Sequence, residues 1–305
     1  MAFSLRKSNF PHMTFQKLQR ILFILSFIAM GASAFVLGFF GLNLGIDFTG
    51  GSLLEVEYEK ERPTTKSIQE SLSGLDLGSL SVQHTGENGV LVRMKDIPES
   101  VHQQVLSLLG EEIQELRFES IGPVIGKELR EKTLLLVGLA MAVVILYIAF
   151  AFRRTAERIR PWHWSGAAMV ASFHDILLPL AVFAVLGEYA GIQVTIPVVV
   201  ALLTVVGYSI NDTVVVFDRI RENIFKHIGF DFKDTVKQAL RQTWFRSLST
   251  SLTTLAVLLS MYLFGGSTLK DFAFMLMIGI IAGTFSSLFL APSLLLMWRK
   301  ELFKV

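Results

Sequence analysis

Six long apolar segments alternate with polar stretches along this chain of 305 residues. An α-helix of about 20 apolar residues is long enough to cross a hydrocarbon core about 30 Å thick. The apolar segments lie at residues 19–40, 133–152, 164–186, 194–217, 247–265 and 271–297. The pattern therefore predicts a multi-pass α-helical membrane protein with six transmembrane helices.

The first apolar segment has two interpretations, a retained span or a cleaved secretory signal. It begins after Lys17 and Arg20 and has the full length of a membrane span. A secretory signal has a shorter apolar core followed by a cleavage site, whereas here the sequence continues as GLNLGIDFTGG. We therefore expect a retained transmembrane helix.

Residues 41–132 form the only polar stretch long enough to fold as a domain outside the membrane. Its alternating apolar positions and turn residues predict strands at 51–58, 80–85, 90–95 and 113–122 and helices at 64–75 and 98–110. The order β-α-β-β-α-β is that of a ferredoxin-like α+β domain. His84 and His102 stand apart from any metal or nucleophile pattern, so we expect both on the surface of a binding or mechanical module.

The composition excludes several classes of protein and of functional site. Apolar residues make up 52% of the chain, and charged residues make up 18%, against about 25% in soluble domains. The absence of cysteine excludes disulfides, iron–sulfur clusters and cysteine-based zinc sites. A net charge of +2 gives no indication of nucleic-acid binding, and a G-x-x-x-x-G-K-[ST] nucleotide motif is missing. We therefore expect a protein that is not an enzyme, that has no cofactor or metal, and that is driven by an ion gradient.

The distribution of Lys and Arg predicts the orientation in the membrane. With a cytoplasmic N-terminus, 18 of the 28 basic residues fall on the cytoplasmic side. The two short outer loops, 187–193 and 266–270, hold only Lys270. Short cytoplasmic loops carry the excess of positive charge. The expected cytoplasmic segments are the tails 1–18 and 298–305 and the loops 153–163 and 218–246, with the domain of residues 41–132 in the periplasm.

Two polar residues occupy the middle of the third apolar segment. His174 and Asp175 are adjacent there, and Pro179 follows four residues after the acid, where it should kink the helix. Charged groups inside a membrane usually face a bundle interior, a partner or a water path. The pair is either part of a proton path or a buried polar contact that fixes helix packing.

Asp212 lies inside the fourth apolar segment. Tyr208 is four residues earlier on the same helix face, and Asn211 and Thr213 flank the acid. Arg246 opens the fifth segment, from where its long side chain can turn inward to Asp212 or extend to the membrane surface. An arginine that moves toward and away from a buried acid would make that acid release and bind a proton. We therefore expect Asp212 to serve either proton coupling or packing.

The segment GIDFTGG joins the first span to the first strand. Gly45, Gly50 and Gly51 permit tight turns or close backbone approach, and Asp47 can cap such a turn. The segment is either a fixed pivot that sets the domain on the membrane or a hinge for its motion.

Two further patterns concern packing. In FKDTVKQALRQTWF, the side chains of Phe232, Val236, Ala239, Leu240 and Phe245 are expected on one face of an amphipathic helix, which suits the membrane surface or a docking partner. The fifth and sixth spans are rich in Ser, Thr and Gly, including a G-x-x-x-G spacing at 279–283. Small residues allow close helix approach, so we expect these spans to pack tightly.

Several of these segments together resemble the SecF family, which are subunits of the bacterial Sec protein-export machinery. They are GIDFTGG, the HD pair of the third span, VVGYSINDTVVVFDRIREN in the fourth, and RSLSTSLTTL opening the fifth. The resemblance extends over about residues 19–297. SecF proteins belong to the RND superfamily of proton-driven transporters, so it implies that the six spans form half of an RND-type body. The family's intramembrane acid and arginine correspond to Asp212 and Arg246.

The same resemblance implies partners and a location. A SecD-type protein would supply six more spans, a larger external domain and a further intramembrane acid. The pair would associate with the SecYEG channel, often with YajC and YidC, in the bacterial inner membrane. It would use the proton gradient to assist translocation of an unfolded preprotein.

Two other functions fit the same residues. A half-size RND-type exporter would carry a lipid or a small molecule, although a domain of this size offers little room for a substrate cavity. A scaffold without a transport step would only stabilise its neighbours in the translocon. Replacement of Asp212 would then disturb assembly rather than coupling.

Overall fold

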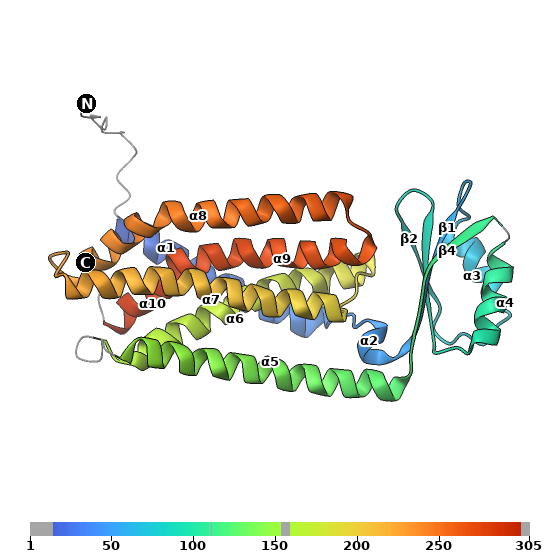
Figure 1. The fold of residues 1–305 in the computed structure, drawn as a ribbon, viewed down its shortest axis with the longest axis horizontal. Helices are drawn as coiled ribbons and strands as arrows, with labels where there is room; N and C mark the ends of the chain where they lie inside the picture. Colours follow the sequence, from blue (N-terminus) through green and yellow to red (C-terminus); the bar gives the residue numbers. More distant parts are fainter. Residues whose placement is uncertain (1–14, 111, 154–158, 300–305) are drawn as a thin grey trace, which may run out of the picture.

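The computed structural model describes residues 15–110, 112–153 and 159–299. They form two parts, a helical body and a smaller sheet domain at one end of it (Figure 1). The body contains six helices that are long and apolar enough to cross a membrane, within the described residues. Its spans are α1 (Phe15–Phe40), α5 (Pro123–Ala151), α6 (Pro161–Ala190), α7 (Ile196–Phe225), α8 (Phe232–Phe264), and a sixth made of α9 (Ser267–Phe285), the π-helix η2 (Ser286–Leu290) and α10 (Ala291–Trp298).

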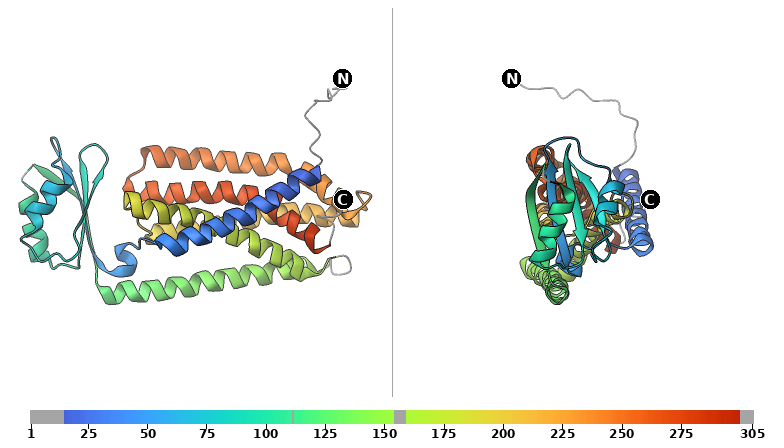
Figure 2. Two further views of the ribbon diagram at one scale, coloured as in Figure 1. Left: turned by 180° about the vertical axis from the view of Figure 1, so that it is seen from behind. Right: turned by 90° about the vertical axis from the view of Figure 1, so that its right-hand side faces the viewer.

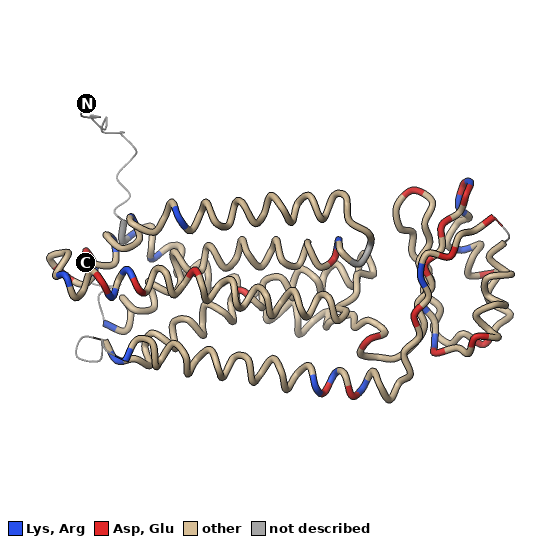
Figure 3. Tube along the Cα trace, in the orientation of Figure 1, with Lys and Arg blue, Asp and Glu red and all other residues tan. Residues whose placement is uncertain are grey.

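The arrangement of the spans separates the two ends of the body. Helix α1 begins and α10 ends at the end remote from the sheet domain, called here the far end (Figure 1). Helix α1 crosses the other spans obliquely, and α5 runs along one edge of the body (Figure 2). Charged residues gather on the sheet domain and at the far end and are sparse along the middle of the body (Figure 3).

The helices at the far end are longer than the hydropathy pattern indicates. Helix α7 continues past the expected end at residue 217 to Phe225, and α8 begins at Phe232 instead of residue 247. The segment expected between the spans, 218–246, is therefore mostly helix, and residues 232–245 form the helix that their amphipathic pattern predicts. Its apolar face does not lie free for a membrane surface or a partner, because Phe232, Val236, Ala239 and Leu240 are buried in the body's own core. Phe245, which we expected on that face, is 81% exposed.

The sheet domain has the element order expected from the sequence. Its elements are β1 (Gly51–Tyr58), α3 (Thr65–Leu72), β2 (Ser81–Thr85), β3 (Gly89–Met94), α4 (Glu99–Leu109) and β4 (Ile113–Ile121). Thr64 caps α3 by accepting a hydrogen bond from the Ser67 amide, because Thr is a favourable N-cap. All strand pairs are antiparallel in the order β2-β3-β1-β4. This topology is consistent with the ferredoxin-like arrangement.

The sheet is covered on both faces. Leu54, Val56, Val90 and Val92 form the core with α3 and α4. The alternate residues of the same strands point toward the helical body, since successive side chains of a strand point to opposite faces. This explains why β1 is buried at seven of its eight positions.

The environment of His102 differs from our expectation. His84 is exposed, but His102 is only 4% exposed, because the inner face of α4 packs on the sheet. Its ring stacks on Phe118 with 3.7 Å between centroids, and its Nδ1 lies 3.2 Å from a Glu99 carboxylate oxygen. His102 is therefore part of the domain core.

Candidate functional site

Two buried carboxylates lie inside the helical body, on neighbouring helices. Asp175 on α6 is 0% exposed, and Asp212 on α7 is 8% exposed. A carboxylate without water needs hydrogen-bond donors to remain in such a place. The donors identify the residues that form this site.

Asp175 connects three elements. Its Oδ1 lies 2.8 Å from Nδ1 of His174 on the same helix. Its Oδ2 accepts hydrogen bonds from Ser286 Oγ of η2, at 2.6 Å, and from Ser209 Oγ of α7. His174 is itself 3% exposed, so the expected polar pair is buried and fully engaged with the bundle.

Asp212 has a similar set of donors on a different set of elements. Its Oδ1 accepts a hydrogen bond from Ser247 Oγ of α8 at 2.6 Å. Its Oδ2 accepts one from Ser287 Oγ of η2. The two acids are therefore joined to the same short element, η2, through adjacent serines.

The π-helix η2 makes this connection possible. Consecutive residues of a helix point in directions about 100° apart, so Ser286 and Ser287 reach acids on two different helices. A π-helical turn is uncommon and is often found at functional sites. Just before it, a side chain at Gly279 would overlap Val205, so α9 approaches α7 closely, as the G-x-x-x-G spacing predicts. This close approach brings the two serines within reach of the acids.

The structure separates Arg246 from Asp212. Arg246 is exposed, and among the described residues no ion pair joins it to Asp212. Ser247 occupies the position that we expected for the arginine. Since the two residues are adjacent on α8, only one of them can face α7. The expected contact is therefore not present in this conformation.

The other polar residues expected near Asp212 have different environments. The Tyr208 hydroxyl donates to Ser251 Oγ at 3.3 Å, and Ser251 is 2.6 Å from Thr284 Oγ1. Thr213 is buried without a hydrogen-bond partner in the described part of the chain, and Asn211 is exposed. The serines on α8 and η2 were expected mainly to serve helix packing. The sequence feature that could have indicated their role is the density of hydroxyl side chains in RSLSTSLTTL and in the Ser286–Ser287 pair.

The segment GIDFTGG forms a packed seat between the two parts of the molecule. Its middle is the short helix α2 (Ile46–Thr49). The Gly45 amide donates to the Val194 carbonyl at 2.8 Å. One Asp47 carboxylate oxygen accepts a hydrogen bond from the Ile196 amide at 2.8 Å, at the first residue of α7. Asp47 therefore caps α7, where a carboxylate is favourable next to the helix N-terminus.

Gly50 and Gly51 close the other side of this seat. Both have positive φ angles, +75° and +137°, which favour glycine. A Cβ at Gly50 would lie 2.6 Å from Pro123 Cα, and a Cβ at Gly126 would lie 2.8 Å from the Gly50 amide nitrogen. The chain entering the sheet domain therefore packs directly on the start of α5, by which the chain leaves it.

Comparison with known proteins places the chain. Residues 101–301 match the family model of the protein export membrane protein SecD/SecF, C-terminal part, and residues 35–61 match the SecD/SecF GG motif. Protein translocase subunit SecF of Thermobaculum terrenum is 36% identical over 294 residues, which cover 92% of each chain. That of Anaerolinea thermophila is 38% identical over 285 residues, again covering 92% of each. The chain belongs to the SecF family. SecF proteins are translocase subunits and not enzymes.

Solved structures of SecDF share the fold. The crystal structure of SecDF, a translocon-associated membrane protein from Thermus thermophilus, has a TM-score of 0.82 at 30% identity. The match covers 95% of the present chain and 39% of that longer protein. A structure of SecDF in a super-membrane-facing form has a TM-score of only 0.66 at 29% identity and the same coverage. At nearly equal identity and coverage, the fold of this chain therefore matches the first structure more closely than the second.

Two opposite charges also face the same cavity between the sheet domain and the body. Arg93 of β3 donates to Gln83 Oε1 at 2.5 Å. Burial lowers the pKa of the Arg93 guanidinium, and the charge of Asp271 on α9 partly opposes that change. Arg93 and Asp271 line a cavity of about 240 Å³ between the sheet and the body.

We expect Arg93 and Asp271 to hold the sheet domain against the body. In a double-mutant cycle with Arg93→Gln and Asp271→Asn, the coupling in unfolding free energy should be about 1 kcal/mol. Detergent-titration unfolding of the purified complex measures it. Lys95→Gln is the matched control, since Lys95 pairs with Asp76 inside the sheet domain. Coupling of Asp271→Asn with Lys95→Gln as large as that with Arg93→Gln would contradict a specific charge interaction between Arg93 and Asp271.

Proposed function

We propose that this chain is the SecF subunit of a Sec translocase and that it works with a SecD-type partner to convert the proton gradient into preprotein movement. The site would be Asp212 and Asp175 with His174, and Arg246 would act on Asp212 in another conformation. The termini would be cytoplasmic and the sheet domain periplasmic, in the bacterial inner membrane. SecYEG, with YajC and YidC, would supply the channel environment.

The observation that carries this proposal is that α7 connects a buried acid to the seat of the sheet domain. Asp212 lies on α7, and Asp47 of the GG segment caps the first residue of that helix. From Ile196 to Asp212 the helix extends about 24 Å at 1.5 Å per residue. A shift of α7 near Asp212 is therefore transmitted along a rigid element to the base of the domain.

The chemistry of the acid supplies the shift. An ionised carboxylate accepts hydrogen bonds on both oxygens, as Asp212 does from Ser247 and Ser287. Protonation turns one oxygen into a donor, so one serine must turn or lose its acceptor. The contacts among α7, α8 and η2 then change, and Ser286 beside Ser287 extends the change to Asp175. One solved SecDF structure is described as a super-membrane-facing form, which supports a protein with more than one conformation.

The greater length of the solved SecDF protein supports a partner. The present chain spans 39% of that protein, whose name combines SecD and SecF. Arg246 is exposed on the outer face of α8, where a partner helix or a rotated α8 would bring it into contact with other groups. Both features suit a body completed by a SecD-type chain.

A complementation experiment tests the proposed function. In a bacterium depleted of its own SecF, this chain expressed with its SecD partner should restore preprotein secretion, and a protonophore should remove the restored part. The chain should also be recovered with SecD and SecY on purification. Restored secretion that ignores the protonophore would support a scaffold, and recovery as a homo-oligomer with bound lipid or small molecule would support an exporter.

A further inference from the structure

Helix α5 stands apart from the other spans over the half that is nearer the sheet domain. Only Gly126 and Ile148, one near each end, are buried. Leu135 is 71% exposed, whereas Met141 and Val144, further along the helix, pack against the core of the body. In two views α5 lies along the edge of the body (Figures 1 and 2). The helix therefore packs on the body near its start and again from Met141 onward, and it leaves space behind residues 130–137.

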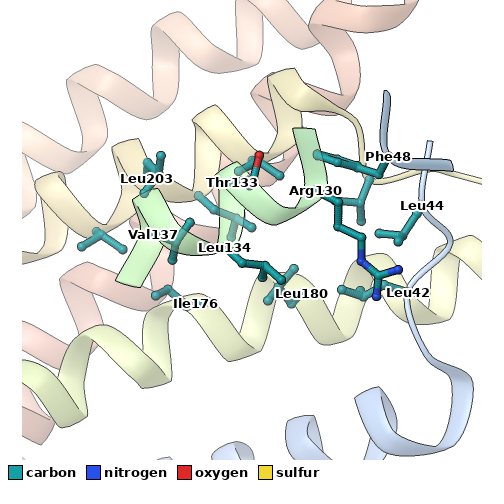
Figure 4. A pocket seen from close by; sticks show the side chains of 14 residues that line it. Leu42, Leu44, Phe48, Arg130, Thr133, Leu134, Val137, Ile176, Leu180 and Leu203 are labelled. Atoms are coloured by element: carbon teal, nitrogen blue, oxygen red, sulfur yellow. The ribbon is translucent and has the colours of Figure 1, made fainter. Parts of the chain in front are cut away.

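A cavity of about 440 Å³ fills that space. It lies between α5 on one side and α6, α7 and the residues before α2 on the other (Figure 4). Of its fourteen lining residues, all but Arg130 and Thr133 are apolar. The volume is within the range of about 300–1,000 Å³ that is usual for small-ligand sites. Its walls come from membrane-spanning segments, so its occupant must be soluble in a membrane.

Arg130 supplies the one charge among the lining residues. Its guanidinium lies beside Leu42, at the end of the cavity nearest the sheet domain (Figure 4). In the described part of the chain Arg130 forms no ion pair, whereas Lys132 on the same helix pairs with Glu128. From Arg130 to Val137 the cavity follows α5 for about 10 Å, at 1.5 Å per residue. A positive group thus stands at one end of an apolar slot.

We propose that this cavity binds an acyl chain of an anionic phospholipid, with the lipid phosphate on Arg130. Guanidinium groups bind phosphate through two parallel hydrogen bonds. Arg130 lies near the start of the span, at the level of the headgroups of one leaflet, so phosphate and chain fall where a lipid places them. An extended peptide fits poorly, because along the apolar length of the cavity its backbone groups would find only the Thr133 hydroxyl, with the Arg130 guanidinium at one end.

Photolabelling tests the acyl chain. The complex of the full chain with its SecD partner is placed in nanodiscs that contain phosphatidylglycerol with a diazirine in one acyl chain. Label should be found on the peptides that contain Val137 and Leu203. Leu134→Trp fills the cavity and should reduce that label about fivefold or more. Leu135→Trp is the matched control, since Leu135 is exposed and does not line the cavity. Equal labelling in both variants would overturn the proposal.

A second arm tests the phosphate. Arg130→Gln should reduce labelling about tenfold, as expected for the loss of a charge-assisted hydrogen bond, whereas Lys127→Gln should leave it unchanged. A diazirine-labelled diacylglycerol, which lacks phosphate, should label the wild-type complex as weakly as phosphatidylglycerol labels Arg130→Gln. Equal labelling by the two lipids would overturn the role of Arg130. Crosslinks from the cavity to a SecD peptide instead of lipid would show that the partner occupies it.

Discussion

Asp212→Asn is expected to remove the part of preprotein secretion that depends on the proton gradient. Asparagine keeps the size of the side chain and can still bond Ser247 and Ser287, but it has no proton to bind or release. Each charge moved across 100 mV supplies about 2.3 kcal/mol, so its loss should slow the driven step by up to about 50-fold. Preprotein translocation into sealed, inverted membrane vesicles, measured with and without a protonophore, gives this component directly.

The controls for Asp212→Asn separate coupling from folding. Asp218→Asn changes an acid on the same helix that pairs with Arg221 at the surface, with a 51% exposed side chain, and it should leave the driven component intact. Ser287→Ala removes one donor to Asp212, so it should weaken the coupling less than Asp212→Asn does. Normal gradient-dependent secretion in Asp212→Asn, at normal protein levels, would exclude Asp212 from the mechanism. Loss of the complex itself would assign the acid to assembly.

The spans and the sheet domain could be predicted because each depends on a local pattern. Apolar length alone identifies a membrane helix, and turn signals such as GENG locate a hairpin, here between β2 and β3. At the far end the amphipathic pattern predicts the helix over 232–245, but neither its continuity with the fifth span nor the extension of α7 to Phe225 was predictable. Helices α7 and α8 continue beyond the apolar segments because they pack on one another there, and hydropathy carries no information about that packing.

The acids of the site could be predicted, but their partners could not. A charge inside an apolar segment is conspicuous, which identifies Asp175 and Asp212 without any structure. A serine in a membrane helix is common, so it does not stand out as a partner for an acid. Whether Ser247 or Arg246 faces Asp212 depends only on the rotation of α8 about its axis. Similarly, η2 inserts an unusual turn that aligns Ser286 and Ser287 with two helices. The direction in which each residue of a helix faces in the folded bundle cannot be read from a single sequence.

The second large effect is expected on stability, from a substitution at Gly50 in the segment GIDFTGG. Gly50→Val should lower the unfolding free energy of the complex by about 2–6 kcal/mol. Gly50 has a φ angle of 75° and a ψ angle of 158°, a region that essentially only glycine adopts, where another residue costs about 1–3 kcal/mol. Overlap with packed neighbours adds about 1–3 kcal/mol. Here the neighbour is the Pro123 backbone, 2.6 Å from the new Cβ, which cannot move without displacing α5. Detergent-titration unfolding of the purified complex measures the loss.

Gly41→Val is the control that isolates the contact. Gly41 ends α1 with a φ angle of +71°, close to that of Gly50, but a Cβ there would meet no atom within 4 Å. Its loss should therefore be limited to the conformational part, about 1–2 kcal/mol. A larger loss at Gly50 would mean that the GG segment works by fastening the sheet domain to α5, so that movement of the domain has to carry α5 or α7 with it. Equal losses would mean that the segment only turns the chain and that the domain is free to swing from it.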